Sequence, residues 1–285
     1  MLRQLDPDLL RTFLAIVADG SFRAAAERIG RTQSAVSMQI QRLEEVAGHQ
    51  LFTRERPFAR LTPKGEALLG YARRLLSLQD EALATLSESA TFGAVRLGMP
   101  DDYATGLLPH ILARFAAEQP RIDLDLRCET SARLISLLDH GELDLAVVTR
   151  TPGRPAGQFL REEPLAWATA RRNPVLGKSP LPVAVFQPDC LARQFVTELL
   201  AKAEKPYRIA YSSPNLAPLL AVAEAGLAVA ALPLSSVPPS LKVLRERDGF
   251  PPLPVLELAL LRSASTASPA IDALADCIIE VAAEM

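Results

Sequence analysis

Polar side chains that can read the edges of DNA bases gather between residues 32 and 42. Glutamine can form two hydrogen bonds with adenine, arginine can do so with guanine, and serine or threonine can bond bases or phosphates. Val36, Ile40 and Leu43 lie at helical spacing, so an inward apolar face leaves the polar residues together on the opposite face. The alternative is a structural helix whose polar face meets only water. The candidate DNA-contacting residues in this segment are Thr32, Gln33, Ser34, Ser37, Met38, Gln41 and Arg42.

Four basic residues follow this segment closely. Residues 51–62 predict two short strands joined by a turn, the form of a wing beside a helix-turn-helix. From it Arg54, Arg56 and Arg60 are expected to project toward phosphates or the minor groove, and Lys64 begins the next helix beside them. These four residues complete the candidate DNA-binding set.

The elements that must position these side chains are short helices with clear ends. Apolar spacing predicts a first helix over residues 7–18, and Ser21 is suited to cap the second helix. Gly30 supplies the turn that ends the second helix, and Thr32 is suited to cap the third. A helix braced by a second helix in this way is a compact means of entering the DNA major groove.

The charge of the chain is distributed unevenly. Residues 23–74 contain ten Lys and Arg against five Asp and Glu, whereas residues from 91 onward contain 19 basic and 22 acidic side chains. A net charge of −2 over 285 residues therefore hides a basic first part and a mildly acidic second part. This division is typical of a DNA-binding module joined to a domain of another function, although a chance asymmetry of the surface would look similar.

A long apolar stripe follows the predicted wing. After Pro63, apolar residues recur at spacings of three, four and seven, which predicts a helix over 63–90 with a broad apolar face. Such a face needs a partner, either a second copy of the chain or the chain's own winged module, and we expect both. The stripe comprises Leu68, Leu69, Tyr71, Leu75, Leu76, Leu78, Ala82, Leu83 and Leu86.

The remainder of the chain alternates between predicted strands and helices, which indicates an α/β domain built on parallel strands. The pattern occurs twice, so we expect two similar halves with a hinged cleft between them. Expected strands cover 94–99, 122–127, 143–148, 181–186, 207–211, 227–233 and 256–261. Expected helices cover 107–117, 132–140, 192–203, 216–225 and 271–281.

In such sheets, ligands bind beyond the carboxyl ends of the strands and near helix N-termini. This rule selects polar residues that directly follow the expected strands of both halves. Each taken alone is also suited to be a cap or turn residue, but together they predict a small-molecule site. The candidates are Asp101, Asp102, Tyr103, Thr105, Thr130, Ser131, Thr149, Arg150, Gln187, Cys190, Ser212, Ser213 and Asn215.

Two of these positions leave the chemistry of the ligand open. Asp101 and Asp102 oppose an anionic ligand, so either the ligand is cationic or polar, or these carboxylates cap the helix and face away. Cys190 is a candidate redox sensor, a hypothesis weakened because no second loop cysteine lies near it in the sequence.

The N-terminal motifs, taken in order, resemble the LysR-type transcriptional regulators. The matching residues are Gly20-Ser21-Phe22, Ala25-Ala26, Gln33-Ser34-Ala35-Val36-Ser37, Leu43-Glu44-Glu45, Leu51-Phe52-Thr53-Arg54 and Leu61-Thr62-Pro63-Lys64-Gly65. One departure is Met38, where many family members place a basic residue; methionine is suited to touch a thymine methyl group.

The resemblance implies an architecture and a set of partners. It implies a winged helix-turn-helix over 1–62, a linker and dimerisation helix over 63–90, and an effector-binding domain over 91–285 that resembles periplasmic binding proteins. That domain would have two Rossmann-like subdomains, about 91–163 with 256–285, and about 164–255. Partners would be double-stranded DNA with an inverted repeat, a small-molecule effector, a second copy of the chain, a further pairing into a tetramer, and RNA polymerase for an activator.

Other classes of protein fit less well. A solute-binding protein of a transport system would share the cleft, but residues 1–8 carry acids where a signal peptide would be apolar. An enzyme is disfavoured because there is no Gly-rich phosphate loop, nucleophile elbow or metal-ligand cluster, and His49, His110 and His140 fall in separate predicted elements. No cofactor is expected. Three widely spaced cysteines and no long apolar run predict a cytoplasmic protein without a membrane span.

Overall fold

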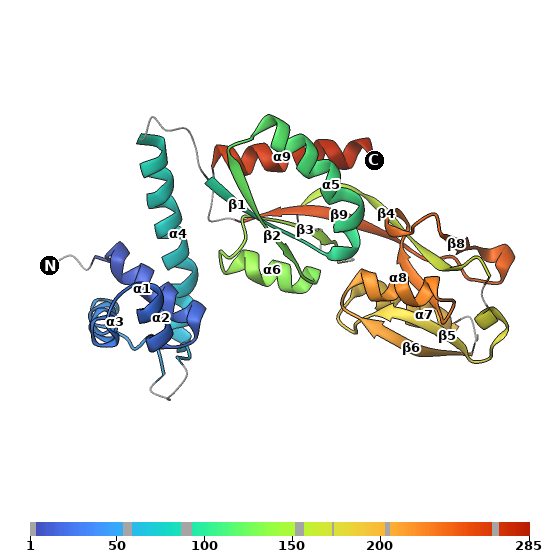
Figure 1. Cartoon of the computed structure of the whole chain (residues 1–285), viewed down its shortest axis with the longest axis horizontal. Coiled ribbons are helices and arrows are strands. Elements are labelled where there is room, and N and C mark those ends of the chain that lie inside the picture. The colour runs from blue at the N-terminus through green and yellow to red at the C-terminus, as the bar shows by residue number, and fades with distance from the viewer. Residues whose placement is uncertain are drawn as a thin grey trace. The chain divides into compact units, whose positions relative to one another are not determined.

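The computed structural model describes residues 4–53, 59–86, 93–151, 157–172, 174–202, 206–263 and 268–285. These residues form two compact units, which are drawn in Figure 1. The first contains the N-terminal 93 residues with two short later segments, and the second contains most of the remainder. The tip of the predicted wing, including Arg54 and Arg56, lies outside the described residues.

The first unit begins with three helices whose ends are set by side-chain caps and glycines. Ser21 accepts a hydrogen bond from the Ala24 N–H, and Thr32 accepts one from the Ala35 N–H, as expected for N-cap residues. The third helix ends at Gly48, whose φ of 73° lies in the left-handed region that favours glycine. The helices are α1 (Pro7–Asp19), α2 (Phe22–Arg28) and α3 (Gln33–Ala47).

A fourth helix, α4 (Pro63–Leu86), closes the core of this unit. Before it, Phe52 and Leu61 pair as an antiparallel bridge, which is the described base of the wing. The Phe52 ring contacts those of Phe13 and Phe22, with centroids 5.3 and 5.4 Å apart. Gly65 is required where α4 crosses this bridge, because a Cβ there would overlap the carbonyl oxygen of Leu51.

The apolar residues of α4 are divided between two faces. Leu69, Ala72 and Leu76 are buried in the core of the first unit. Other apolar residues of the stripe remain on the surface and are not covered by this unit. On this exposed face Tyr71, Leu75 and Leu78 are 61%, 44% and 62% exposed, and Leu83, which is in line with Leu69 and Leu76 nearer the end of α4, is 58% exposed.

The second unit is built on one continuous sheet. Among the described residues the strand order is β2-β1-β3-β9-β4-β7-β5-β6, with β8 paired to β4. The long strands β4 and β9 run between its two halves (Figure 1). The strands are β1 (Gly93–Met99), β2 (Ile122–Cys128), β3 (Leu145–Thr149), β4 (Gln158–Ala170), β5 (Leu181–Phe186), β6 (Tyr207–Ser213), β7 (Val229–Pro233), β8 (Leu241–Leu244) and β9 (Val255–Arg262).

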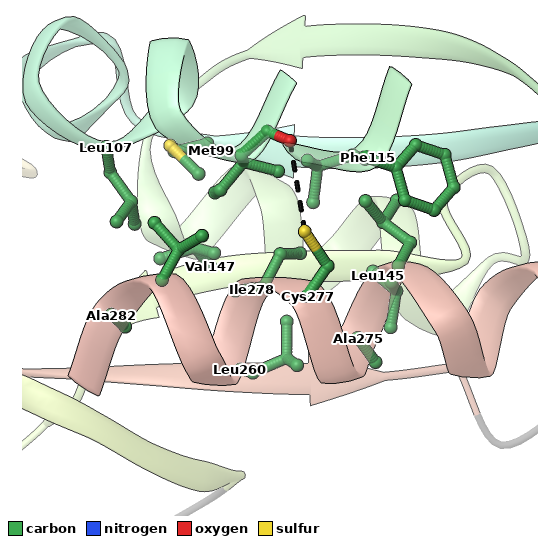
Figure 2. Packing of buried hydrophobic residues seen from close by; sticks show 14 of the residues in the cluster. Met99, Leu107, Phe115, Leu145, Val147, Leu260, Ala275, Cys277, Ile278 and Ala282 are labelled. Carbon is green, nitrogen blue, oxygen red and sulfur yellow. Dashed lines mark hydrogen bonds between the residues drawn. The ribbon is translucent and has the colours of Figure 1, made fainter. Parts of the chain in front are cut away.

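Helices cover both faces of the first half of the sheet. Residues of β3 alternate between two cores, because successive side chains of a strand point to opposite faces. Leu145 and Val147 pack with α5 (Asp101–Glu118) and α9 (Pro269–Glu284), as Figure 2 shows, and the Cys277 thiol donates to the Ile111 carbonyl at 3.8 Å. Ala146 and Val148 pack on the other face with α6 (Ser131–Asp139).

The second half repeats this arrangement. One core joins β5 and β7 to α7 (Leu191–Lys202), with Trp167 against Phe250 at 5.6 Å between ring centroids. The other core joins the opposite face of the same strands to α8 (Leu216–Glu224). Short 3₁₀ turns complete the described elements at η1 (Pro174–Gly177), η2 (Leu234–Ser236) and η3 (Glu246–Asp248).

The structure departs from the predicted elements in two ways that bear on function. The expected helix 107–117 begins at Asp101, because the two aspartates favour a helix N-terminus even though Gly106 and Pro109 weaken the helical pattern. Strand β4 had no predicted counterpart, since the charged Arg161, Glu162 and Glu163 and Pro164 interrupt its apolar pattern. No helix in the described part of the chain meets the length and hydropathy of a membrane span.

Candidate functional site

The polar face of α3 is open to solvent along its whole length. The apolar residues Val36, Ile40 and Leu43 are buried against the rest of the first unit, as their spacing predicted. Met38 is 68% exposed, an unusual position for a large apolar side chain. The candidate DNA-contacting residues of this segment are all exposed, namely Thr32, Gln33, Ser34, Ser37, Met38, Gln41 and Arg42.

Three hydrogen bonds that the sequence did not predict fix the orientation of α3. The Thr12 hydroxyl of α1 donates to Gln39 Oε1 at 2.8 Å, which ties the middle of α3 to α1. At the other end Glu44 Oε1 accepts from the N–H groups of Leu51 and Phe52, at 2.7 and 3.3 Å. These contacts hold the exposed face on a fixed support, as recognition of base edges requires.

Two of the four basic candidates lie in the described residues, Arg60 at the base of the wing and Lys64 in the first turn of α4. Arg60 and Lys64 are both exposed. The Thr53 N–H donates to the Arg60 carbonyl at 2.8 Å, which joins the two sides of the wing. The Ala59 N–H donates to the Gly20 carbonyl at 2.9 Å, which attaches the base of the wing to the end of α1.

The second unit contains a cavity of about 310 Å³ between its two halves. This volume is suited to a small molecule, at the low end of common ligand sites. The first turns of α5, α6 and α7 and the cap of α8 line it, so helix N-termini from both halves surround the space. The predicted site residues that line it are Asp101, Asp102, Tyr103, Thr130, Ser131, Thr149, Gln187, Cys190 and Asn215.

Four predicted residues do not line this cavity. Arg150 pairs instead with Glu257, at 3.0 Å between Nη1 and Oε2, because the residue after β3 turns toward β9. Ser212 lies in β6 and bonds the Phe186 carbonyl, and Ser213 accepts from the Asn215 N–H at 3.0 Å. Thr105 donates to the Asp101 carbonyl within α5 at 3.2 Å. Each of these polar groups is used in local structure.

The two adjacent aspartates have different environments. Asp101 Oδ2 accepts from the Leu216 N–H at 2.8 Å, so it caps α8 across the cavity instead of its own helix. Asp102 is 6% exposed, its Oδ1 accepts from the Tyr103 N–H at 3.1 Å, and its carbonyl accepts from the Ser236 hydroxyl. Burial, and then the charge of Asp101, raise the pKa of Asp102 from 3.8 to about 7.

A chain of hydrogen bonds links the lining residues of the first half. The Tyr103 hydroxyl lies 2.7 Å from the Thr149 hydroxyl, and the Thr149 N–H donates to the Ser131 hydroxyl at 3.0 Å. Burial raises the pKa of Tyr103 well above its ordinary value, so the phenol is neutral. These hydrogen-bonded groups form a polar wall of the cavity.

The cavity brings two cysteines to the same space from different elements. Cys190 was expected there, and Cys128, which ends β2, was missed although it precedes the predicted Thr130 by only two positions. Burial raises the pKa of Cys190 to about 11, so its thiol is protonated and oxidises slowly, which weakens the redox-sensor hypothesis. Among the described residues, no three His, Cys, Asp or Glu gather as a metal site.

Further lining residues were missed because the prediction took only some of the positions that follow each expected strand. Glu129 and Asp189 are adjacent to predicted residues in sequence, so a wider window around each strand end would have included them. The remaining missed residues come from helix turns, flanking loops and the end of β5. They are Ala132, Ile135, Thr151, Phe186, Leu191, Ala192, Gln194 and Pro214.

The chain matches two family descriptions that together span most of its length. Residues 7–66 match the bacterial regulatory helix-turn-helix protein of the lysR family, and residues 89–283 match the LysR substrate binding domain. The HTH-type transcriptional regulator DgdR of Burkholderia cepacia is 36% identical over 90% of this chain and 88% of its own.

Solved structures of the same kind resemble the whole chain. ArgP from Mycobacterium tuberculosis is 25% identical, with a TM-score of 0.75 and 99% of each chain covered. LysG from Corynebacterium glutamicum, solved with the bound effector Arg, is 26% identical with a TM-score of 0.68, covering 98% of this chain and 99% of its own. The sequence motifs, the fold and the relatives of this chain together establish that it belongs to the LysR-type transcriptional regulators, which join a DNA-binding helix-turn-helix to an effector-binding domain.

Proposed function

We propose that α3 reads an inverted-repeat DNA site and that a small molecule in the cavity of the second unit changes how the bound protein holds that DNA. The observation that carries the proposal is the exposed polar face of α3 on a rigidly supported helix. Gln33 and Arg42 are suited to adenine and to guanine or phosphate, and Met38 is suited to a thymine methyl group. Arg54, Arg56, Arg60 and Lys64 would contact the backbone or the minor groove.

The exposed face of α4 supports pairing of two chains. Tyr71, Leu75, Leu78 and Leu83 are large, apolar and open to solvent, and a second copy of the same helix would bury them. Two recognition helices fixed in this way would read half-sites about one helical turn apart. We further propose that pairs of dimers form a tetramer and that an activating form contacts RNA polymerase.

The cavity supports control by a small molecule because it is lined from both halves of the second unit. A ligand that binds the closed arrangement more tightly would shift the population toward it, and thereby change the angle between paired recognition helices. LysG, which is similar to this chain, was solved with such an effector. We propose no enzymatic role, in agreement with relatives named as transcriptional regulators, and place the protein in the cytoplasm with the DNA it binds.

A gel-shift experiment with the DNA upstream of its own gene tests the proposal. The full chain should shift this DNA specifically, and Gln33→Ala and Arg42→Ala should each weaken binding by roughly tenfold or more, equivalent to the ~1–3 kcal/mol of a good base contact. Arg121→Ala is a matched control, since Arg121 is an exposed arginine of the second unit. Its binding should equal that of the unmodified protein.

Two outcomes would contradict the proposal. One is the absence of any specific shift on this DNA, and the other is a specific shift that neither Gln33→Ala nor Arg42→Ala weakens. A turnover of substrate that survives removal of residues 1–90 would instead support an enzyme.

A further inference from the structure

The charged side chains that line the cavity are all of one sign. Asp101, Asp102, Glu129 and Asp189 line it, and none of the described lining residues is Lys, Arg or His. An anionic ligand would therefore meet repulsion from several directions with no cation to compensate for it. A cationic ligand would instead be attracted by these carboxylates.

Two arginines that adjoin lining residues in sequence have partners outside the cavity. Arg150 follows the lining residue Thr149, but it is held by Glu257 and by the Gly157 carbonyl. Arg193 lies in the first turn of α7, but its Nη1 donates to the Phe186 carbonyl and to the Ser212 hydroxyl, each at 3.0 Å. Neither arginine is among the residues that line the cavity.

Asp102 differs from the other fully buried acids of the described residues. Asp144 is met by Arg96, with Nη2 2.6 Å from Oδ1, and Glu163 is met by Arg161. Asp102 is comparably buried, at 6% exposed, yet no ion pair joins it to a described Lys, Arg or His, and it is one of the residues that line the cavity. A buried carboxyl without a compensating charge tends to stay protonated, and a cation supplied from the cavity would favour its ionised form.

Two of the helix N-termini around the cavity, those of α5 and α8, already have a carboxylate of the protein bound to them. Asp101 Oδ2 already accepts from the first N–H of α8, and Asp102 Oδ1 accepts from the Tyr103 N–H in the first turn of α5. The protein's own carboxylates thus occupy the positive ends of two helices. The N-terminus of α6, next to Thr130 and Ser131, is left to accept a carboxylate if the ligand has one.

We infer that the cavity binds a small molecule carrying a protonated amine, which pairs with Asp102 and Glu129, and that it excludes anions lacking an amine. This inference rests on the proposed role of the cavity as the effector site and specifies the chemistry of that effector. The raised pKa of Asp102 is consistent with it, since an ammonium group would stabilise the charged carboxylate.

Calorimetry on the full chain tests the inference with three five-carbon probes and with L-lysine, whose two amines are also separated by five carbons. Pentane-1,5-diamine, L-lysine, glutarate and pentane-1,5-diol differ in charge but little in size. The diamine or lysine should bind and raise the Tm, whereas glutarate and the diol should not. Binding of lysine but not of the diamine would show that the ligand also needs a carboxylate. Binding of the diamine but not of lysine would show that it does not.

Substitutions then locate the binding. Asp102→Asn should weaken binding of the amine at least tenfold, and Glu129→Gln should weaken it less because Glu129 is exposed. Glu129→Gln remains informative even if Asp102→Asn disturbs the fold, since a change at an exposed side chain leaves the fold intact. Asp123→Asn, at an exposed aspartate of β2 outside the cavity, should have no effect.

Three results would overturn the inference: tighter binding of glutarate than of either amine, no binding of either amine at millimolar concentration, or amine binding unaffected by Asp102→Asn and Glu129→Gln. None of these affects the gel-shift result on upstream DNA. Failure of the amine inference is therefore distinguishable from failure of the proposed regulatory function.

Discussion

At the scale of single residues, the burial of Asp102 lowers the stability of the folded protein when its carboxyl is charged. The folded protein keeps its proton up to about pH 7, whereas the unfolded chain loses it near pH 3.8. Between these values the folded state binds more protons, so the free energy of unfolding falls as pH rises, and the penalty is complete above pH 7. The groups that act on Asp102 are Asp101 and Glu163, with Tyr103 and Cys190 nearby.

Replacing Asp102 with asparagine should remove this penalty. A pKa rise of about three pH units corresponds to roughly 4 kcal/mol, so Asp102→Asn should raise the free energy of unfolding by ~2–4 kcal/mol at pH 8 and much less at pH 4. Urea denaturation at both pH values measures this difference, with Asp123→Asn as the control. An equal effect of Asp102→Asn at both pH values would contradict it.

Met38 is the position of the recognition helix where a change should alter specificity most directly. Its side chain is 68% exposed and departs from the basic residue common in the family. Met38→Lys should replace an apolar contact with a phosphate or guanine contact, and so change preference at one base pair by ~1–3 kcal/mol. Binding measured on operators that differ only at that base pair checks this. Equal discrimination by both proteins would show that residue 38 does not touch a base.

At the scale of elements, the sequence predicted those parts whose periodicity is uninterrupted. The exposed face of α3 followed from the spacing of Val36, Ile40 and Leu43, and both caps followed from Ser21 and Thr32. The start of α5 and the whole of β4 did not follow, because glycine, proline and charged residues there are accommodated by tertiary packing. The sequence also did not show that Arg150 turns away from the cavity, since that depends on Glu257, 107 positions later.

Helix α4 divides its apolar residues between the first unit and a free face, and the free face should pair two chains. Leu78→Asp would place a charge beside Tyr71 and Leu75, and should weaken the dimer at least tenfold. Sedimentation over a range of concentrations measures this, and Leu227→Asp, at a leucine 49% exposed in the second unit, is the matched control. A dimer unaffected by Leu78→Asp would assign the contact to another surface.

At the scale of the whole molecule, the cavity lies where a ligand can change the relation between two halves. The halves are joined by β4, which pairs with β9 up to Pro164 and with β7 and β8 from Leu165 onward. Asp101 on α5 bonds the first N–H of α8 in the other half at 2.8 Å. A ligand in the cavity lies next to this bond and touches lining residues of both halves, so it can act on both halves at once.

Ligand binding should change the form of the DNA complex more than its affinity. With a ligand that binds the cavity by calorimetry, the protected DNA segment should lengthen or shorten while the Kd for DNA changes less than about tenfold, a coupling of under ~1.4 kcal/mol. DNase I footprinting with and without ligand measures this. An unchanged footprint at saturating ligand would contradict control through recognition-helix geometry.

The central claim, that α3 reads DNA sequence for a paired regulator, is tested most directly by selection from random DNA. The full chain should enrich an inverted repeat whose half-sites lie about one helical turn apart. The same selection with Gln33→Ala and Arg42→Ala together should lose the motif, and with Arg121→Ala should retain it. Enrichment of no motif, or of the same motif by the doubly substituted chain, would contradict the account.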